Sequence, residues 1–294
     1  MTHAGELAAL VTAFCWACTA IAFASAGRRI GSMAVNILRL AMAFVLLSAR
    51  GLVVRGLPFP TDADRRAWIW LALSGIAGFT FGDLCLFRAF VVLGPRLSTL
   101  LMSLSPPFAA AIAWWCEGER LSTLDLAGMT ITLAGVSWAV LAREGATGHA
   151  TFTGILLGIG GALGQAAGLV LSKHGMGSYD AFAATQIRVL SGMAGFALVF
   201  TLVGWWPQVR ASVRDRTALG HTAVGAFFGP FLGVSMSLYA VQHTATGVAA
   251  SIMASTPVMI LPFLAITRSE RIGPSAIGAA LVAVAGVTLL FAPA

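Results

Sequence analysis

The stretch "SLSPPF", residues 103–108, places two adjacent prolines inside a run that otherwise has the composition of a helix buried in lipid. A proline lacks the backbone N–H and frees the carbonyl four residues earlier, so Pro106 predicts a break and frees the carbonyl of Met102. The stretch "STPVMILP", residues 255–262, repeats the pattern around Pro257. Because unpaired carbonyls are not tolerated against lipid, both breaks are expected to face protein or a wet cavity.

The composition identifies the chain as an integral membrane protein. Of its 294 residues, 58% are hydrophobic and only 10% are charged, whereas a soluble domain carries about 25% charged residues. A helix needs about 20 predominantly apolar residues to cross a bilayer. By this measure the sequence predicts ten spans, at residues 5–25, 33–50, 67–92, 97–116, 123–142, 152–173, 181–204, 218–242, 245–267 and 273–292. Little sequence remains for a soluble domain.

The two proline breaks belong to an internal repeat. A shift of 151 residues superposes residues 75–141 on residues 226–292, and Pro106 then falls on Pro257. The other matches fall mainly on glycines and on a charged turn, which are the positions that shape a helical fold. A shift of 149 residues extends the match upstream to the start of each half.

The repeat predicts the architecture. Each half, residues 1–146 and residues 147–294, contains five predicted spans, and an odd number forces the second half to enter the membrane from the opposite side. We therefore predict an all-α integral membrane protein of ten transmembrane helices, arranged as two inverted five-helix repeats around a central cavity. Secondary transporters with inverted repeats bind substrate near the midplane, at interrupted helices in corresponding positions of the two halves.

The repeated pattern resembles the drug/metabolite transporter superfamily, in particular its EamA-type members. The pattern runs through "LFRAFVVLGPRLSTLLMSLSPPF" and "LYAVQHTATGVAASIMASTPVMI", and continues into "EGERLSTLDLAGMTITLAGV" and "RSERIGPSAIGAALVAVAGV". An arginine early in the second span of each half, Arg39 and Arg188, also fits. The resemblance covers essentially the whole chain. It implies both termini in the cytoplasm and a cavity lined mainly by spans 1, 3, 4, 6, 8 and 9.

Within the superfamily the chain is most similar to amino-acid exporters of the YddG type. This similarity implies a secondary transporter that exports small amphipathic metabolites, in particular neutral and aromatic amino acids, by alternating access between the repeats. One alternative is export of drugs or of another metabolite class, such as nucleosides or sugars. A second alternative, an intramembrane enzyme, would need clustered carboxylates, histidines or a nucleophile at one depth. The spans contain a single deep acid, so we expect no enzymatic activity.

Polar and aromatic side chains at repeat-matched positions are the candidates for substrate binding. Trp16 is the tryptophan at mid-span, and its repeat partner is Gln165. Hydroxyl groups beside the freed carbonyls either cap them or line the cavity. The predicted substrate-binding residues are Trp16, Asp83, Ser103, Ser105, Gln165, Tyr239, Ser255 and Thr256, with Pro106 and Pro257 as the kink residues.

Charged residues inside the spans form a second group of candidates. Asp83 lies deep in the third span, where it is expected to bind a substrate ammonium, to take up a proton or to form a structural ion pair. Arg88 is five residues away and points elsewhere on a straight helix, so Asp83 is expected to meet Arg39 or a polar cavity. Arg39, Arg88 and Arg188 are predicted to be structural or gating charges, and Arg39 and Arg88 have the alternative of reaching the lipid headgroups.

The remaining features predict simple requirements. The cysteines of "CWAC", residues 15–18, have apolar neighbours, and the histidines are scattered, so we expect no metal and no cofactor. The net charge of +7 is attributed to lipid headgroup contacts, with no nucleic-acid partner. The expected partners are a small-molecule substrate and the bilayer, with the protein a monomer or weak dimer. We expect a multi-pass protein of the inner (plasma) membrane with cytoplasmic N- and C-termini. That orientation comes from the resemblance, because the loop charges do not decide it.

Overall fold

The computed structural model describes residues 3–93, 95–142, 151–259 and 274–291, which form helices and turns without a strand. The first half contains α1 (Ala4–Ile30), α2 (Ser32–Arg55), α3 (Arg65–Gly75), η1 (Ile76–Gly82), α4 (Asp83–Leu93), α5 (Pro95–Met102), α6 (Ser105–Glu117) and α7 (Thr123–Ala142). The second half contains α8 (Phe152–Met176), α9 (Ala181–Val203), α10 (Trp206–Ser212), α11 (Arg216–Ala226), η2 (Phe227–Gly233), α12 (Val234–His243), α13 (Thr246–Met253), α14 (Thr256–Met259) and α16 (Pro274–Leu290).

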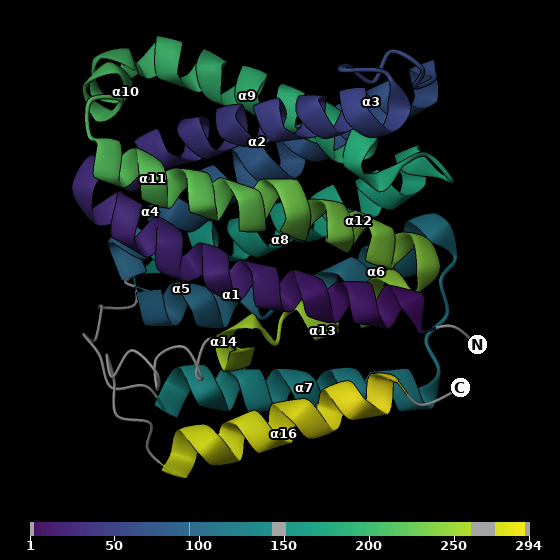
Figure 1. Cartoon of the computed structure of the whole chain (residues 1–294). Coiled ribbons are helices and arrows are strands. Elements are labelled where there is room, and N and C mark those ends of the chain that lie inside the picture. Colours follow the sequence, from purple (N-terminus) through teal and green to yellow (C-terminus); the bar gives the residue numbers. More distant parts are fainter. Residues whose placement is uncertain (1–2, 94, 143–150, 260–273, 292–294) are drawn as a thin grey trace.

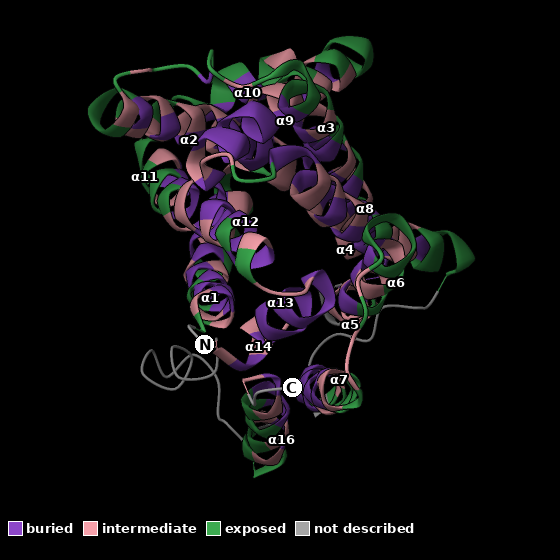
Figure 2. Ribbon diagram, turned by 90° about the vertical axis from the view of Figure 1, so that its right-hand side faces the viewer, coloured by how far each residue is buried: buried purple, intermediate pink, exposed green. Residues whose placement is uncertain are grey.

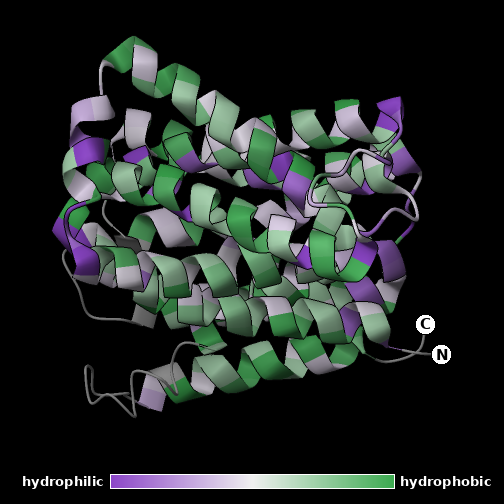
Figure 3. Cartoon of the chain, turned by 45° about the horizontal axis from the view of Figure 1, so that its top comes forward, coloured by the Kyte–Doolittle hydropathy of each residue, from purple (hydrophilic) through white to green (hydrophobic). Residues whose placement is uncertain are grey.

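The helices have the length and surface of membrane spans. In the described ranges, eight helices are long and apolar enough to cross a bilayer, and two shorter apolar helices cover Thr246–Met259 and Ile277–Leu290. Large apolar side chains lie on the outside, with Trp115 84% and Leu202 77% exposed. Such exposure is unfavourable in water and favourable against acyl chains. Hydrophilic residues collect mainly near the helix ends (Figure 3).

Helix starts outside the apolar core follow local capping chemistry. Asp64, Asp180 and Asp215 precede α3, α9 and α11, and each carboxylate accepts a hydrogen bond from the backbone N–H three residues later. This cap satisfies one of the free N–H groups of the first turn. Ser122 and Asp125 form the reciprocal cap that the sequence "STLD" predicts before α7.

The first and last described residues, His3 and Phe291, lie on one face of the molecule, which we call the terminal face. The rings of His3 and Phe291 are 5.8 Å apart between centroids. Helix α1 leaves this face, α2 returns to it, and α3, η1 and α4 together cross away from it again. The second face, where α1 ends and α2 begins, is the opposite face.

The two halves cross the membrane in opposite directions. Helix α8 is antiparallel to the span formed by α3, η1 and α4, because Gly154 at its start packs against Leu93 and Gly175 at its end packs against Trp70. Helix α8 therefore begins at the opposite face, whereas α1 begins at the terminal face. This confirms the predicted inversion of the second repeat.

The first helix of each repeat packs into the other repeat. Helix α8 lies against η1, where Gly164 meets Gly82 and Gly168 meets Gly78. Helix α1 lies against α11, η2 and α12 in the same way (Figure 1), with Trp16 beside Gly233. The small residues permit close backbone approach, which is a main source of helix association in lipid. The exchange locks the two repeats into one body.

The third span of each repeat contains a π-helical turn that the sequence analysis did not predict. Segments η1 (Ile76–Gly82) and η2 (Phe227–Gly233) lie 151 residues apart, at matching positions of the repeat. The apolar runs predict continuous helices over 67–92 and 218–242. A π-helical turn widens the helix by one residue and leaves backbone groups to be paired elsewhere, and such turns occur often at functional sites.

The predicted proline breaks are present. Helix α5 ends at Met102 and α6 begins at Ser105, while α13 ends at Met253 and α14 begins at Thr256. The interruptions again differ by 151 residues. Each proline lies in the first turn of the second half-helix, where its missing N–H costs nothing. Pro262, the further proline of the second break, and the Glu270-Arg271 turn lie outside the described residues.

Helices α7 and α16 pack against each other as a separate pair. Gly135 lies against the backbone of Ala283, and Gly286 lies against the backbone of Thr132. In Figure 2 this pair lies apart from the other helices, next to α13 and α14, and much of its outer surface is exposed.

Candidate functional site

A cavity of about 380 Å³ lies between the two repeats. The breaks and both first helices reach it, and most of its surface is apolar. The residues that line it are Trp16, Thr19, Ala20, Arg39, Phe79, Asp83, Leu86, Thr99, Met102, Ser103, Ser105, Pro106, Val136, Gln165, Leu169, Arg188, Val234, Ser237, Ala250, Met253, Ala254, Thr256 and Pro257. A mainly apolar wall with a few polar groups is typical of a small-molecule site.

The two helix breaks face this shared cavity. Pro106 and Pro257, from opposite repeats, both line it, together with Met102 and Met253 at the ends of the preceding half-helices. The hydroxyl group of Thr256 donates a hydrogen bond to the carbonyl of Met253 at 2.7 Å. This is the capping that the sequence analysis predicted for a freed carbonyl.

The polar centre of the cavity joins both repeats. Asp83, which is 5% exposed, forms an ion pair with Arg39 through its Oδ2 atom. Its Oδ1 atom accepts a hydrogen bond of 2.9 Å from the side-chain amide of Gln165. The same amide nitrogen lies 3.2 Å from the carbonyl oxygen of Gly78, inside the π-helical turn. The turn therefore presents Asp83 and a backbone carbonyl to one side chain of α8.

Arg188 is the second cation of the cavity and is 4% exposed. Its guanidinium lies over the ring of Phe79, 5.1 Å from the centroid. Its Nε atom is buried without a hydrogen-bond partner in the described structure. The carboxylate of Asp83 contacts Arg39 and is too far from the guanidinium of Arg188 to form an ion pair with it. Arg188 and Arg39 are repeat partners, yet among the described residues only Arg39 has a carboxylate in contact.

Most of the predicted substrate-binding residues line the cavity. Two of them, Tyr239 and Ser255, do not, and neither does Arg88, which was predicted to be a structural or gating charge. Tyr239 is two residues from Ser237, which lines the cavity, so its side chain points to the other side of α12. There its ring stacks on that of His243, with centroids 4.1 Å apart. Ser255 is buried beside a second, apolar pocket and donates to the carbonyl of Ile252. Arg88 lies on the exposed side of α4.

Several lining residues were missed by the sequence analysis. Phe79 and Val234 lie in or next to the π-helical turns, whose position depends on tertiary packing. Thr19 and Ser237 are single hydroxyl residues in apolar runs, a pattern too common to attract attention. The repeat-matched glycines Gly78 and Gly229 were the available signal, because each lies inside a turn.

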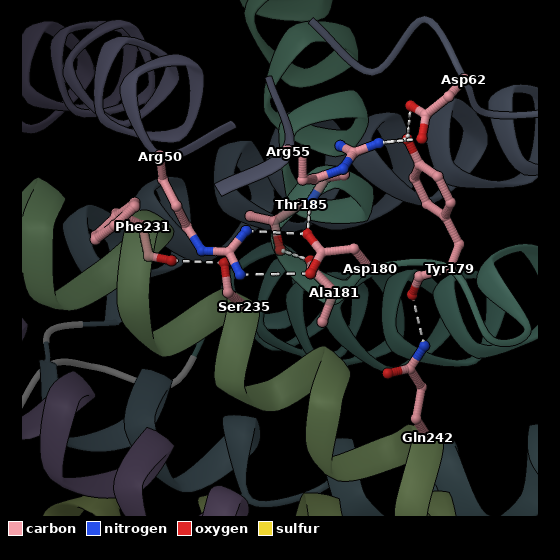
Figure 4. A network of polar contacts seen from close by, with 11 residues as sticks. Arg50, Arg55, Asp62, Tyr179, Asp180, Ala181, Thr185, Phe231, Ser235 and Gln242 are labelled. Atoms are coloured by element: carbon pink, nitrogen blue, oxygen red, sulfur yellow. Dashed lines mark hydrogen bonds and ion pairs between the residues drawn. The ribbon is translucent and has the colours of Figure 1, made fainter. Parts of the chain in front are cut away.

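A network of polar contacts links the repeats at the terminal face (Figure 4). Arg50 at the end of α2 forms an ion pair with Asp180 at the start of α9, with 3.1 Å between Nη1 and Oδ1. Arg55 pairs with Asp62 and donates to the hydroxyl group of Tyr179, which in turn donates to Asp62 at 2.9 Å. The C-terminal part of α2 and the loop that follows it are thus held against the connection between α8 and α9.

At neutral pH the protonation states of Asp62 and Tyr179 favour the contacts among Arg55, Asp62 and Tyr179. The hydrogen bond from Arg55 lowers the pKa of Asp62, so its carboxylate is charged. Burial raises the pKa of Tyr179 to about 12, so its hydroxyl group keeps the proton that it donates. Asp62 therefore accepts from a cation and from a neutral donor together.

Glu119 is a second link at the terminal face. It lies between α6 and α7, and its Oε1 atom is 2.6 Å from Nζ of Lys173 on α8. It also accepts from the backbone N–H and the hydroxyl group of Thr246 at the start of α13, both at 2.8 Å. On the opposite face of the described structure, Arg29 pairs with Asp215 at 2.8 Å.

These features define a polytopic membrane protein with a central cavity between two inverted repeats, which is the architecture of a secondary transporter. The chain belongs to the EamA-like transporter family, which it matches over residues 3–141 and again over residues 152–292. It is therefore a membrane transporter of the drug/metabolite transporter superfamily.

Comparison with solved structures supports the fold. A structure titled "Crystal structure of protein" has a TM-score of 0.77 and 19% sequence identity, and the match covers 99% of this chain and 97% of the other. No curated protein matches the sequence.

Proposed function

We propose that the protein exports small amphipathic metabolites, and that neutral and aromatic amino acids are its substrates. The observation that supports this proposal is the cavity between the repeats. Its apolar wall includes Trp16, Phe79 and Met253, and its polar residues cluster around Asp83 and Gln165. An amino acid likewise has an apolar part and a polar part. Its side chain would contact the apolar wall, and its charged groups would lie among the polar residues of the cavity. A volume of about 380 Å³ accommodates a ligand of that size.

We further propose that the protein lies in the inner membrane with cytoplasmic termini. In this orientation we propose that the terminal-face contacts act as a gate between the cavity and the cytoplasm. For export, this network opens to admit substrate and re-forms before release at the opposite face. Rocking of one inverted repeat against the other accomplishes this exchange.

Counterflow in proteoliposomes tests the substrate class. Vesicles loaded with unlabelled phenylalanine are expected to accumulate radiolabelled phenylalanine above protein-free vesicles. Gln165→Ala is expected to reduce the initial rate about tenfold, because it removes the donor to Asp83 and Gly78. Arg88→Ala, outside the cavity, is the matched control and keeps the wild-type rate. Absence of counterflow for all twenty amino acids contradicts the assignment, and competition by drugs, nucleosides or sugars would redirect it.

The gate at the terminal face has its own prediction. Glu119→Ala removes an ion pair and two hydrogen bonds to a charged group, and one such hydrogen bond alone contributes about 1.5–3 kcal/mol. The open population is therefore expected to rise by at least about tenfold. Ala250→Cys, in a background without other cysteines, reports access to the cavity. A membrane-impermeant maleimide applied at the terminal face labels this cysteine faster in Glu119→Ala than in the parent protein.

Asp215→Asn is the matched control for that experiment. It removes an ion pair at the opposite face and keeps the cap on α11, since asparagine also caps a helix. Labelling from the terminal face should be unchanged in this variant. Equal labelling of Glu119→Ala and the parent protein would contradict the gate.

A further inference from the structure

Three ionisable side chains line the cavity in the described part of the chain: Arg39, Asp83 and Arg188. One carboxylate and two guanidinium groups leave a net charge of +1. Asp83 is in contact with Arg39 and with Gln165, so its oxygens already have partners. The excess positive charge therefore lies on Arg188.

The repeat shows what Arg188 lacks. Arg39 and Arg188 are equivalent positions, and the position equivalent to Asp83 in the second repeat is Val234. Val234 lines the same cavity. The second repeat thus has the arginine of the ion pair and an apolar residue in place of its carboxylate.

A buried guanidinium without a contacting anion is energetically unfavourable. Arginine does not lose its proton in proteins, so neutralisation is not available to it. The ring of Phe79 offsets part of the cost by a cation–π contact. Within the described residues the Nε of Arg188, like that of Arg39, is buried without a hydrogen bond, so the difference between the two arginines is the carboxylate that only Arg39 contacts there. A ligand carboxylate supplies what is missing, because its two oxygens match the guanidinium fork.

We infer that Arg188 binds a carboxylate group of the transported molecule. This carboxylate pairs with Arg188 as the carboxylate of Asp83 pairs with Arg39. This inference rests on the proposed function for the identity of the substrate and extends it to a chemical requirement. One carboxylate group of the substrate pairs with the one guanidinium of the cavity that lacks a contacting anion, which favours a carboxylate over a phosphate ester with its charge near −2. The apolar wall accepts the rest of the ligand.

Two ligands of nearly equal shape test the inference without amino-acid transport. The purified protein in detergent is titrated with 3-phenylpropionate and with 3-phenylpropanamide, and its melting temperature is recorded. The carboxylate is expected to raise the melting temperature, with an apparent Kd at least tenfold below that of the amide. Arg188→Gln should remove this difference and Arg188→Lys should keep part of it. Inorganic phosphate, as a third ligand, is expected to give no shift.

Val234→Asp is the most specific variant, because it places a carboxylate where the repeat has lost one. We expect it to pair with Arg188, to fold at least as well as the parent protein and to lose the response to 3-phenylpropionate. Val234→Asn, of the same size without charge, is the matched control and keeps a measurable response. Both variants elute as a single species if folded, which separates a lost site from a lost fold.

The outcomes separate the two proposals. Binding of 3-phenylpropionate that depends on Arg188, without counterflow of any amino acid, removes the assigned substrate and keeps the carboxylate site. Counterflow of phenylalanine with equal binding of acid and amide, unchanged in Arg188→Gln, overturns the carboxylate site. A shift with phosphate that exceeds the shift with 3-phenylpropionate overturns it as well.

Discussion

Gly164→Val is expected to prevent formation of the folded transporter. A Cβ atom at position 164 would lie 2.6 Å from the Cα of Gly82 and 2.8 Å from the carbonyl oxygen of Ala77. Both atoms belong to the backbone of the π-helical turn, so no change of rotamer relieves the overlap. Helices α8 and η1 would have to separate, and the contact between the repeats would be lost with them. Overpacking of this kind costs about 1–3 kcal/mol and more where the backbone must move.

The measurement is the melting temperature and the elution profile of detergent-solubilised protein. Gly164→Val should elute as aggregate or melt well below the parent protein. Gly220→Val on α11 is the matched control, because a Cβ there has no atom within 4 Å. Its effect should stay within about 0.5 kcal/mol, as for most surface substitutions. A Gly164→Val protein that melts with the parent would mean that α8 and η1 do not approach as described.

The architecture was predictable because it depends on signals that are local in the sequence. Long apolar runs give the spans, and an odd number of spans in each repeat gives the inversion. The prolines gave the positions of the breaks, since Pro106 and Pro257 lose the same hydrogen bond in any helical context. These signals do not depend on how the helices pack against one another.

The details of the site were less predictable because they depend on packing between the repeats. The π-helical turns have no residue that requires them: η2 contains Pro230, whereas η1 contains no proline. What the two turns share is the close approach of a helix from the other repeat. Tyr239 and Ser255 were predicted to line the cavity and are close in sequence to Ser237 and Thr256, which do line it. One residue along a helix turns a side chain by about 100°, so such proximity does not fix the direction of a side chain.

Among the charged residues, Asp83 was predicted to meet Arg39 or a polar cavity, and the structure shows it both paired with Arg39 and on the cavity. The prediction followed from helix geometry, which excluded Arg88 on the same helix. The unequal state of the two repeat-related arginines was not predicted. In the described part of the chain Arg39 contacts a carboxylate and Arg188 does not, which only the three-dimensional structure shows.

Asp83→Ala is expected to abolish transport and to destabilise the protein strongly. Asp83 is 5% exposed and pairs with Arg39, so its removal leaves a second uncompensated guanidinium in the same cavity as Arg188. Breaking a buried ion pair from one side costs about 3–5 kcal/mol. The melting temperature should therefore fall far below that of the parent protein, and counterflow should be lost.

The double variant Arg39→Met with Asp83→Leu separates stability from function. Replacing both partners of a buried pair by apolar residues of similar volume is neutral or stabilising in many proteins, so this variant is expected to recover most of the melting temperature. Counterflow should remain absent, because Gln165 has lost its carboxylate partner and the cavity its polar centre. Transport by the double variant at the parent rate would show that the pair serves only the fold. Equal melting of Asp83→Ala and the parent protein would show that Arg39 finds another partner, and the polar centre described here would then be wrong.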